Sequence, residues 1–214
     1  MTDPKKPRKA APNRKRSNPE RHAWHNTAKR QLKPGNMLNP VPVVMVSCGE
    51  TPEEYNIFTV AWCGTLCSDP PLCYISVRPE RHSYPIIKAH KEFVINLVSS
   101  DLTERTDWCG VRSGKKYNKF YETGLTPVRG SVVKAPLIYE SPVNLECVVK
   151  EIIPLGTHDM FIAEVVAVHA ADGLFDANGE MHLDRAGLVA YANGHYYGLG
   201  KVLGKFGFSV QKKK

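Results

Sequence analysis

Short runs of branched aliphatic and aromatic residues, each bounded by proline or glycine, constrain this chain more than any other feature. Runs of this length and composition predict β-strands. Strands do not alternate with long amphipathic helices, so a doubly wound α/β fold is not expected. The sequence therefore predicts a mainly β protein, an antiparallel β-barrel or sandwich with α insertions. The predicted strands cover residues 41–48, 57–64, 72–78, 92–97, 137–140, 143–153, 160–170 and 187–191.

Two segments between the strands are predicted to be helical. Ser83 is placed to cap a short helix over residues 84–90, because a serine hydroxyl can accept a backbone N–H bond at a helix start. Residues 101–124 are polar and are interrupted by Gly110 and Gly114, so one or two short helices are expected there.

The alternation within residues 143–153 predicts which side chains share a face of the sheet. Leu145 and Cys147 face one way and Glu146 faces the other, as in a sheet packed mainly on one side. Glu146 is therefore expected on the more polar face.

Positive charge is concentrated at the N-terminus. The 214-residue chain has a net charge of +8, but residues 1–34 hold eleven Lys or Arg and two acids, which leaves −1 for the rest. Residues 1–34 are also poor in aliphatic residues, so they are predicted to be a disordered basic tail, followed by one folded domain over residues 35–210. Nucleic-acid binding is not expected except through this tail, because it requires a basic patch on the folded body.

The cysteines and the hydropathy pattern exclude further classes. None of the six cysteines forms a Cys-x-x-Cys pair, so no metal site is expected, and free cysteines fit a reducing compartment. No run of 18 apolar residues and no signal-peptide core are present, so no membrane partner is expected and the protein is expected to be cytoplasmic.

Polar residues stand at the edges of three predicted strands within residues 56–96. Arg78, Arg81 and Ser83 fall within six residues, and arginine together with hydroxyl donors suits a phosphate group. The pattern indicates a phosphorylated, planar cofactor. The glycine-rich residues 194–200 have the wrong spacing for a dinucleotide-binding loop.

Several short motifs follow one another in order: Asn39-Pro-x-Pro42, Asn56-x-x-Thr59-x-Ala-Trp62, Pro70-Pro71, Ser76-Val-Arg-Pro79, Arg81-His-Ser83 and Glu92-Phe-Val-Ile-Asn96. Their succession over about residues 37–205 resembles the flavoredoxin branch of the flavin reductase-like family. The resemblance implies an FMN-binding split β-barrel of the antiparallel Greek-key type. It also implies a homodimer, and an oxidoreductase that transfers electrons from NAD(P)H or a redox-protein donor through bound FMN.

The resemblance further implies which residues contact the cofactor. One group would line the isoalloxazine and ribityl site, a second would hold ribityl and phosphate, and a third would complete the pocket. In that order they are Asn56, Thr59, Val60, Ala61, Trp62 and Cys63; Ser76, Val77, Arg78, Arg81, His82 and Ser83; and Asn96, Lys119 and Phe120.

The residues leave some alternatives open. Asn96 is either a ligand contact or a structural hydrogen-bond node, because a buried amide must find partners. Tyr196 and Tyr197 either border a substrate site or pack at a subunit interface. The protein is either a flavin reductase enzyme or a flavin-binding electron carrier without nicotinamide activity. The rival from another class is a nucleic-acid-binding β-barrel with a basic arm.

Overall fold

The computed structural model describes residues 27–211. The chain divides into two compact units, Met1–Asn36 and Met37–Lys214, and the fold described below is that of the second. Most of the predicted basic tail lies outside the described residues.

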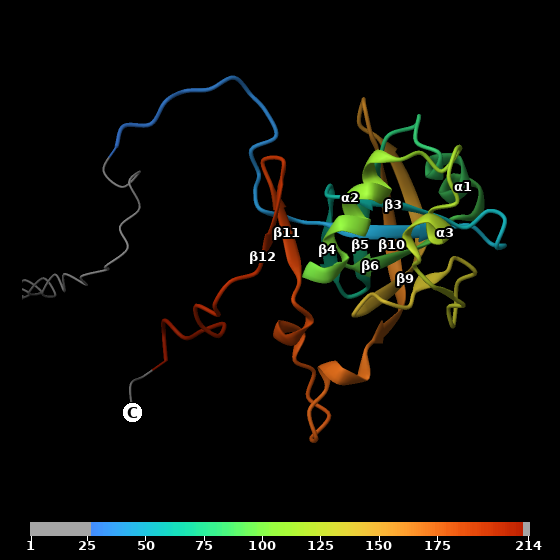
Figure 1. The fold of residues 1–214 in the computed structure, drawn as a ribbon. Helices are drawn as coiled ribbons and strands as arrows, with labels where there is room; N and C mark the ends of the chain where they lie inside the picture. The colour runs from blue at the N-terminus through green and yellow to red at the C-terminus, as the bar shows by residue number, and fades with distance from the viewer. Residues whose placement is uncertain (1–26, 212–214) are drawn as a thin grey trace, which may run out of the picture. The chain divides into compact units, whose positions relative to one another are not determined.

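A seven-stranded antiparallel sheet forms the body of the second unit (Figure 1). Its hydrogen-bonded order is β3-β2-β6-β9-β10-β5-β4, so neighbours such as β2 and β6 are joined by crossovers rather than by hairpins. The prediction of a mainly β, antiparallel fold with helical insertions is confirmed. The strands are β2 (Val44–Cys48), β3 (Asn56–Val60), β4 (Cys63–Ser68), β5 (Pro71–Val77), β6 (Glu92–Leu97), β9 (Val143–Pro154) and β10 (Asp159–Ala170).

The two edge strands of this sheet, β3 and β4, are consecutive in the chain. Only Ala61 and Trp62 connect them, although five strands lie between them in the sheet. A connection this short requires the sheet to curl until its edges approach each other. The prediction of one strand over residues 57–64 is corrected, because the chain turns a corner at Ala61 and Trp62 and changes partners.

Two smaller sheets complete the β structure. In one, β1 (Val41–Pro42) pairs with β11 (Val189–Ala192), which pairs with β12 (His195–Gly198). In the other, β7 (Pro127–Val128) pairs with β8 (Leu137–Ile138). The single strand predicted over residues 41–48 is therefore two strands in different sheets, because Pro42 has no N–H with which to continue a ladder.

The helices are short. They are α1 (Ser83–His90), α2 (Thr103–Val111) and α3 (Lys119–Thr123), with 3-10 turns at Ser100–Leu102, Asp172–Leu174 and Leu183–Ala186. The prediction that Ser83 caps α1 is wrong: His82 is the N-cap, without a side-chain cap bond, and the Ser83 hydroxyl accepts a bond from Asn56 instead. No helix in residues 27–211 is long and apolar enough to cross a membrane.

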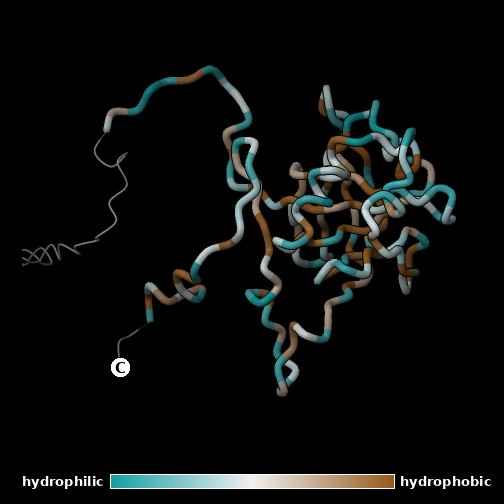
Figure 2. The backbone as a smooth tube through the Cα atoms, in the orientation of Figure 1, coloured by the Kyte–Doolittle hydropathy of each residue, from teal (hydrophilic) through white to brown (hydrophobic). Residues whose placement is uncertain are grey.

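The main core lies inside the curled sheet. Val46, Ile75, Phe93 and Phe161 contribute fully buried or nearly fully buried side chains from four different strands. Apolar residues of the strands accordingly appear as brown segments within the body in Figure 2. A second cluster packs α2 and α3 against the other face of β2 and β3 through Met45, Ile57, Cys109 and Phe120.

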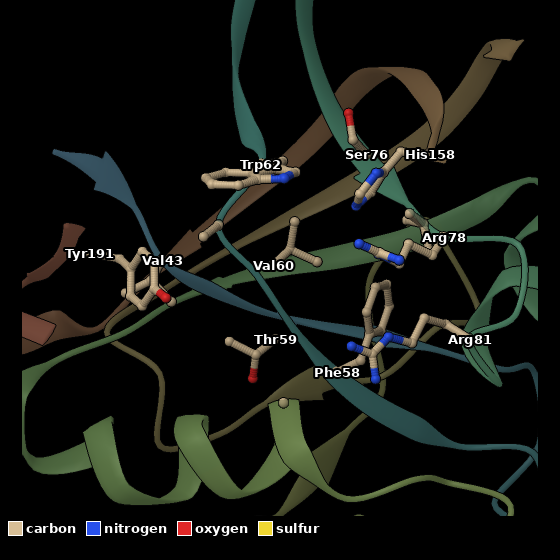
Figure 3. A pocket seen from close by; sticks show the side chains of 13 residues that line it. Val43, Phe58, Thr59, Val60, Trp62, Ser76, Arg78, Arg81, His158 and Tyr191 are labelled. Carbon is tan, nitrogen blue, oxygen red and sulfur yellow. The ribbon is translucent and has the colours of Figure 1, made fainter. Parts of the chain in front are cut away.

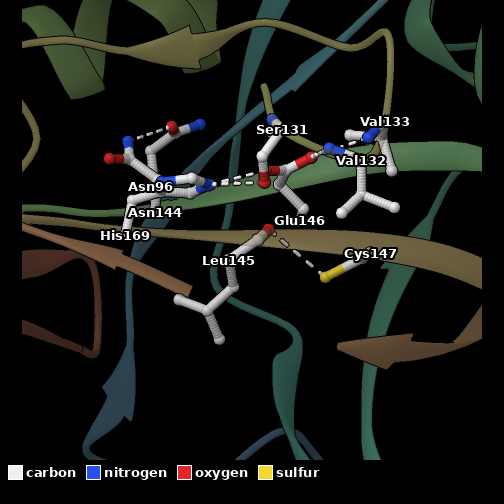
Figure 4. Close-up of polar contacts among 9 residues, drawn as sticks. All are labelled: Asn96, Ser131, Val132, Val133, Asn144, Leu145, Glu146, Cys147 and His169. Atoms are coloured by element: carbon white, nitrogen blue, oxygen red, sulfur yellow. Dashed lines mark hydrogen bonds and ion pairs between the residues drawn. The ribbon is translucent and has the colours of Figure 1, made fainter. Parts of the chain in front are cut away.

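Glu146 on β9 is fully buried, which corrects its expected place on a polar face. Its carboxylate accepts bonds from the backbone N–H groups of Ser131, Val132 and Val133 and from the Ser131 hydroxyl, and it contacts His169 at 2.5 Å (Figure 4). Burial alone would raise the pKa of Glu146, but these donors together lower the pKa to about 2. The carboxylate therefore fixes the loop at residues 130–133 over the sheet.

Glu146→Gln is expected to lower the free energy of unfolding by about 3 kcal/mol at pH 7, because about two pKa units of stabilisation are lost. The folded-state pKa is depressed, so this contribution is present above the unfolded value of about 4.3 and is lost as the pH falls toward 2. Urea unfolding at pH 7 and pH 3 measures it. Glu164→Gln breaks a part-exposed pair with Lys150 and should cost less than about 1 kcal/mol. Equal effects of the two substitutions would contradict the assigned role of Glu146.

Candidate functional site

Two adjoining cavities form one groove beside the edge strand β3. The first cavity has a volume of about 260 Å³ and the second about 370 Å³. Both are lined by Phe58, Thr59, Arg78, Arg81 and Gly110, so they are continuous. The groove lies between β3, the end of β5, the start of α1 and the C-terminal end of α2.

The first cavity is more apolar than the second. Trp62 from the β3–β4 corner, Val60 from β3 and Tyr191 from β11 line it (Figure 3). The corner is held against β5 because the Ser76 N–H donates to the Trp62 carbonyl at 2.8 Å. Flat and branched side chains on several sides make a slot suited to a planar ring.

The second cavity is strongly cationic. Arg78, Arg81, Arg112 and Lys119 line it, and Glu80 is the only acid among the lining residues. Glu80 lies 3.4 Å from Arg78, where both side chains are exposed. The remaining three cations have no carboxylate partner among the described residues, so this half of the groove is suited to an anion.

Lys119 is the most unusual of these cations because its side chain is buried. It is 3% exposed, and its Nζ donates to the Cys109 carbonyl at 2.6 Å. Burial lowers the pKa of Lys119 to about 8, and the neighbouring charge of Arg81 acts in the same direction. A buried ammonium bound only to a carbonyl is costly, and an anion in the cavity would compensate the charge.

Two histidines line the groove, one in each half. Burial, together with the charges of Lys115 and Lys119, lowers the pKa of His82. Burial and the charge of Arg78 lower the pKa of His158, which stands beside Arg78 in the first cavity (Figure 3). Both imidazoles are therefore biased toward the neutral form, able to donate or accept a hydrogen bond.

Glycines bring two segments close to the groove wall. At Gly114 a Cβ would lie 2.4 Å from Asn56 Oδ1 and 2.5 Å from His82 Cδ2, so no larger residue fits without displacing them. At Gly110 on α2 a Cβ would lie 3.1 Å from the Thr59 Cβ. The chain from Gly110 to Gly114 thus closes the cationic half of the groove.

Most residues implied by the family resemblance come together along this groove. Its walls include Asn56, Thr59, Val60, Ala61, Trp62, Ser76, Val77, Arg78, Arg81, His82, Ser83 and Lys119. Some of their polar atoms already have partners: Thr59 Oγ1 donates to the Thr106 carbonyl, and Asn56 Nδ2 donates to Ser83 Oγ at 2.6 Å.

The structure does not bring Cys63, Asn96 and Phe120 into the groove wall. Cys63 and Phe120 are buried in the two hydrophobic clusters. Asn96 is fully buried on β6, where its amide nitrogen donates to the Met45 carbonyl at 3.0 Å and its oxygen accepts the Ile138 N–H at 3.0 Å. A further bond from Asn144 completes a network that ties β2, β6 and β9 to the segment around Ile138, so Asn96 is a structural node (Figure 4).

Several lining residues were missed by sequence reasoning. His158 lies in the turn between β9 and β10, and Tyr191 lies on β11, both far from the predicted motifs in the chain. Val43, Phe58, Gly110, Arg112, Ser113 and Gly114 also line the groove. Tyr196, which was considered as a substrate contact, instead donates its hydroxyl to Asp107 on α2 at 3.0 Å and lies outside the walls of both cavities. The glycines flanking Arg112 were a usable signal, but nothing local marks His158.

Comparison with known proteins identifies the class. The model of the flavin reductase like domain matches residues 37–200. A protein of Archaeoglobus fulgidus is 31% identical over 145 residues, which is 68% of this chain and 81% of that protein. The flavoredoxin of Desulfovibrio vulgaris (Miyazaki F) superposes with a TM-score of 0.80 and 28% identity over 86% of this chain and all of that chain. A flavoredoxin from Methanosarcina acetivorans shares the fold, with a TM-score of 0.77 and 23% identity over 86% of this chain and all of that chain. The chain therefore belongs to the flavin reductase-like family, and its curled sheet is the split barrel of that family.

The depressed pKa of Lys119 makes the stability of the ligand-free protein depend on pH. Between about pH 8 and the unfolded value of about 10.4 the unfolded state binds more protons, so stability should rise with pH across this window. Between pH 7 and pH 10.5 the free energy of unfolding of the wild type should rise by about 3 kcal/mol relative to that of Lys119→Met.

Urea unfolding at the two pH values measures this gain. Lys88→Met, at an exposed position on α1, is the matched control. Its free energy of unfolding should vary with pH as that of the wild type does. Parallel curves for Lys119→Met and the wild type would show that Lys119 is not a destabilising buried charge.

Proposed function

We propose that the protein is an FMN-dependent oxidoreductase of the flavin reductase type, with FMN in the groove beside β3. The observation that carries this proposal is the buried ammonium of Lys119, which shares the cationic cavity with Arg81 and has no carboxylate partner among the described residues. A phosphate supplies the missing charge, and arginine binds phosphate with two parallel bonds.

The groove matches the two ends of FMN. The phosphate lies in the cationic cavity with Arg81, Ser83 and Lys119, and the isoalloxazine lies in the apolar cavity beside Val60 and Trp62. Bound FMN supplies the redox chemistry. The protein binds and orients it, and the apolar walls exclude water from the ring.

The grouping of the cations favours FMN over FAD. Arg81 and Lys119 stand together in one cavity, as a single terminal phosphate requires.

An enzyme is favoured over a simple carrier because flat side chains, on which a planar nicotinamide can lie, border the first cavity. Trp62 and Tyr191 from different elements border it, and His158, biased toward neutrality, provides a hydrogen-bonding group without added charge. A planar nicotinamide can enter such a slot. Rapid bleaching of the bound flavin by reduced nicotinamide supports the enzyme, and its absence supports a carrier that receives electrons from a redox protein.

Purified protein should be yellow and should bind FMN. Arg81→Ala should weaken FMN binding about tenfold to a hundredfold, since a hydrogen bond to a charged group contributes about 1.5–3 kcal/mol. Ser83→Ala should weaken it less. Fluorescence titration of FMN measures both. Arg185→Ala, in a 3-10 turn outside the walls of both cavities, is the control and should bind normally. A colourless protein that fails to bind added FMN contradicts the proposed function.

We further propose that the protein is a homodimer, because apolar residues after β12 are exposed. Several apolar side chains within residues 199–210 are exposed: Leu203 is 93% and Phe206 103% exposed. Their apolar colouring is visible near the C-terminus in Figure 2. Phe206 and Phe208 alone can bury roughly 300–500 Å², and with the neighbouring aliphatic residues they approach the about 800 Å² per partner of a stable interface. A second copy of the chain covers this segment.

Replacing both Leu203 and Phe206 by serine should convert the dimer into a monomer, because the apolar area that drives association is removed. Light scattering coupled to gel filtration measures the mass. Leu155→Ser, at an exposed apolar position in the β9–β10 turn, should leave the dimer intact. A monomeric wild type, or a double variant that remains dimeric, would contradict this interface.

A further inference from the structure

The loop between α2 and α3 carries three cations, at positions 112, 115 and 116. Arg112, Lys115 and Lys116 are exposed, and none of them is ion-paired with a carboxylate among the described residues. Arg112 and Gly114 of this loop line the cationic cavity, and the charge of Lys115 lowers the pKa of His82 in the same cavity. The loop therefore brings positive charge to the groove.

The loop is held in a fixed conformation. The Ser113 carbonyl accepts the N–H groups of Lys116 at 3.0 Å and Tyr117 at 3.2 Å, and the Ser113 hydroxyl accepts that of Lys115 at 3.3 Å. The guanidinium of Arg112 lies over the Tyr117 ring, 5.7 Å from its centroid. Cations on a backbone that is already ordered lose less entropy when they bind a ligand.

The charge balance leaves this positive charge unneutralised after FMN binds. Arg78 pairs with Glu80, and a phosphate carrying about two negative charges is matched by Arg81 and Lys119. Arg112, which lines the same cavity, and Lys115, which is close to His82, remain. A second ligand that shares this groove is therefore expected to be anionic as well.

We infer that Arg112, Lys115 and Lys116 bind the 2′-phosphate of a nicotinamide dinucleotide, and that the protein consequently uses NADPH in preference to NADH. This inference rests on the proposed function. A dinucleotide that lies along the groove places its nicotinamide in the apolar cavity and its adenosine phosphates at the rim of the cationic cavity. NADPH differs from NADH by one phosphate, which is the group that unpaired lysines and an arginine recognise.

Calorimetric titration of the FMN-loaded protein with adenosine 2′,5′-bisphosphate and with AMP tests the inference without turnover. The bisphosphate should bind more tightly than AMP. Lys115→Gln combined with Lys116→Gln should weaken binding of the bisphosphate by about fivefold or more, since each exposed charge contributes a modest binding free energy. AMP affinity should change much less, and the KM for NADPH should rise while kcat stays similar.

Lys88→Gln combined with Lys91→Gln is the matched control, because it removes two lysines from another surface. It should change the affinity for neither the bisphosphate nor AMP. Equal affinity for the bisphosphate and AMP, or equal loss of both in the Lys115/Lys116 variant, would overturn the inference. So would a variant that weakens FMN or FAD itself, because the cations would then serve the flavin. If the wild type binds no FMN, the proposed function fails. If it binds FMN but neither nucleotide, only this inference fails.

Discussion

The two-residue connection between β3 and β4 is the constraint on which the rest of the structure depends. Because Ala61 and Trp62 join strands at opposite edges of the sheet, the sheet has to curl. The same corner places Trp62 against β5 through its bond to Ser76. Curling thus creates both the enclosed core and the groove outside it. Residues of β3 and of β5 line the groove on either side of the corner.

The cationic half of the groove is assembled from segments that are distant in the chain and individually ordinary. Arg81 follows β5, His82 begins α1, and Lys119 begins α3. The approach of Arg81 and Lys119 is unfavourable without a ligand, because two positive charges lie in one cavity and Lys119 is buried. The fold tolerates this arrangement because two apolar clusters hold the surrounding strands and helices in place.

The sequence predicted the strands well because their apolar runs are long and are bounded by turn residues, and the family motifs predicted most of the groove wall. It failed where tertiary packing decides. The alternation around Glu146 suggested a polar face, but a distant loop covers it. Ser83 was expected to cap α1 but bonds Asn56. His158 and Tyr191 reach the groove only because the chain folds back toward it before β10 and at β11. No local sequence pattern predicts these two contacts.

The position of Lys119 has a consequence for how cofactor occupancy responds to its surroundings. The phosphate of the proposed FMN would favour the protonated form of this amine, so binding above about pH 8 would be accompanied by proton uptake from the buffer. The apparent binding enthalpy would then vary with the ionisation heat of the buffer, and release of the proposed cofactor would become easier in alkaline conditions. Lys119 would thus make cofactor binding depend on pH.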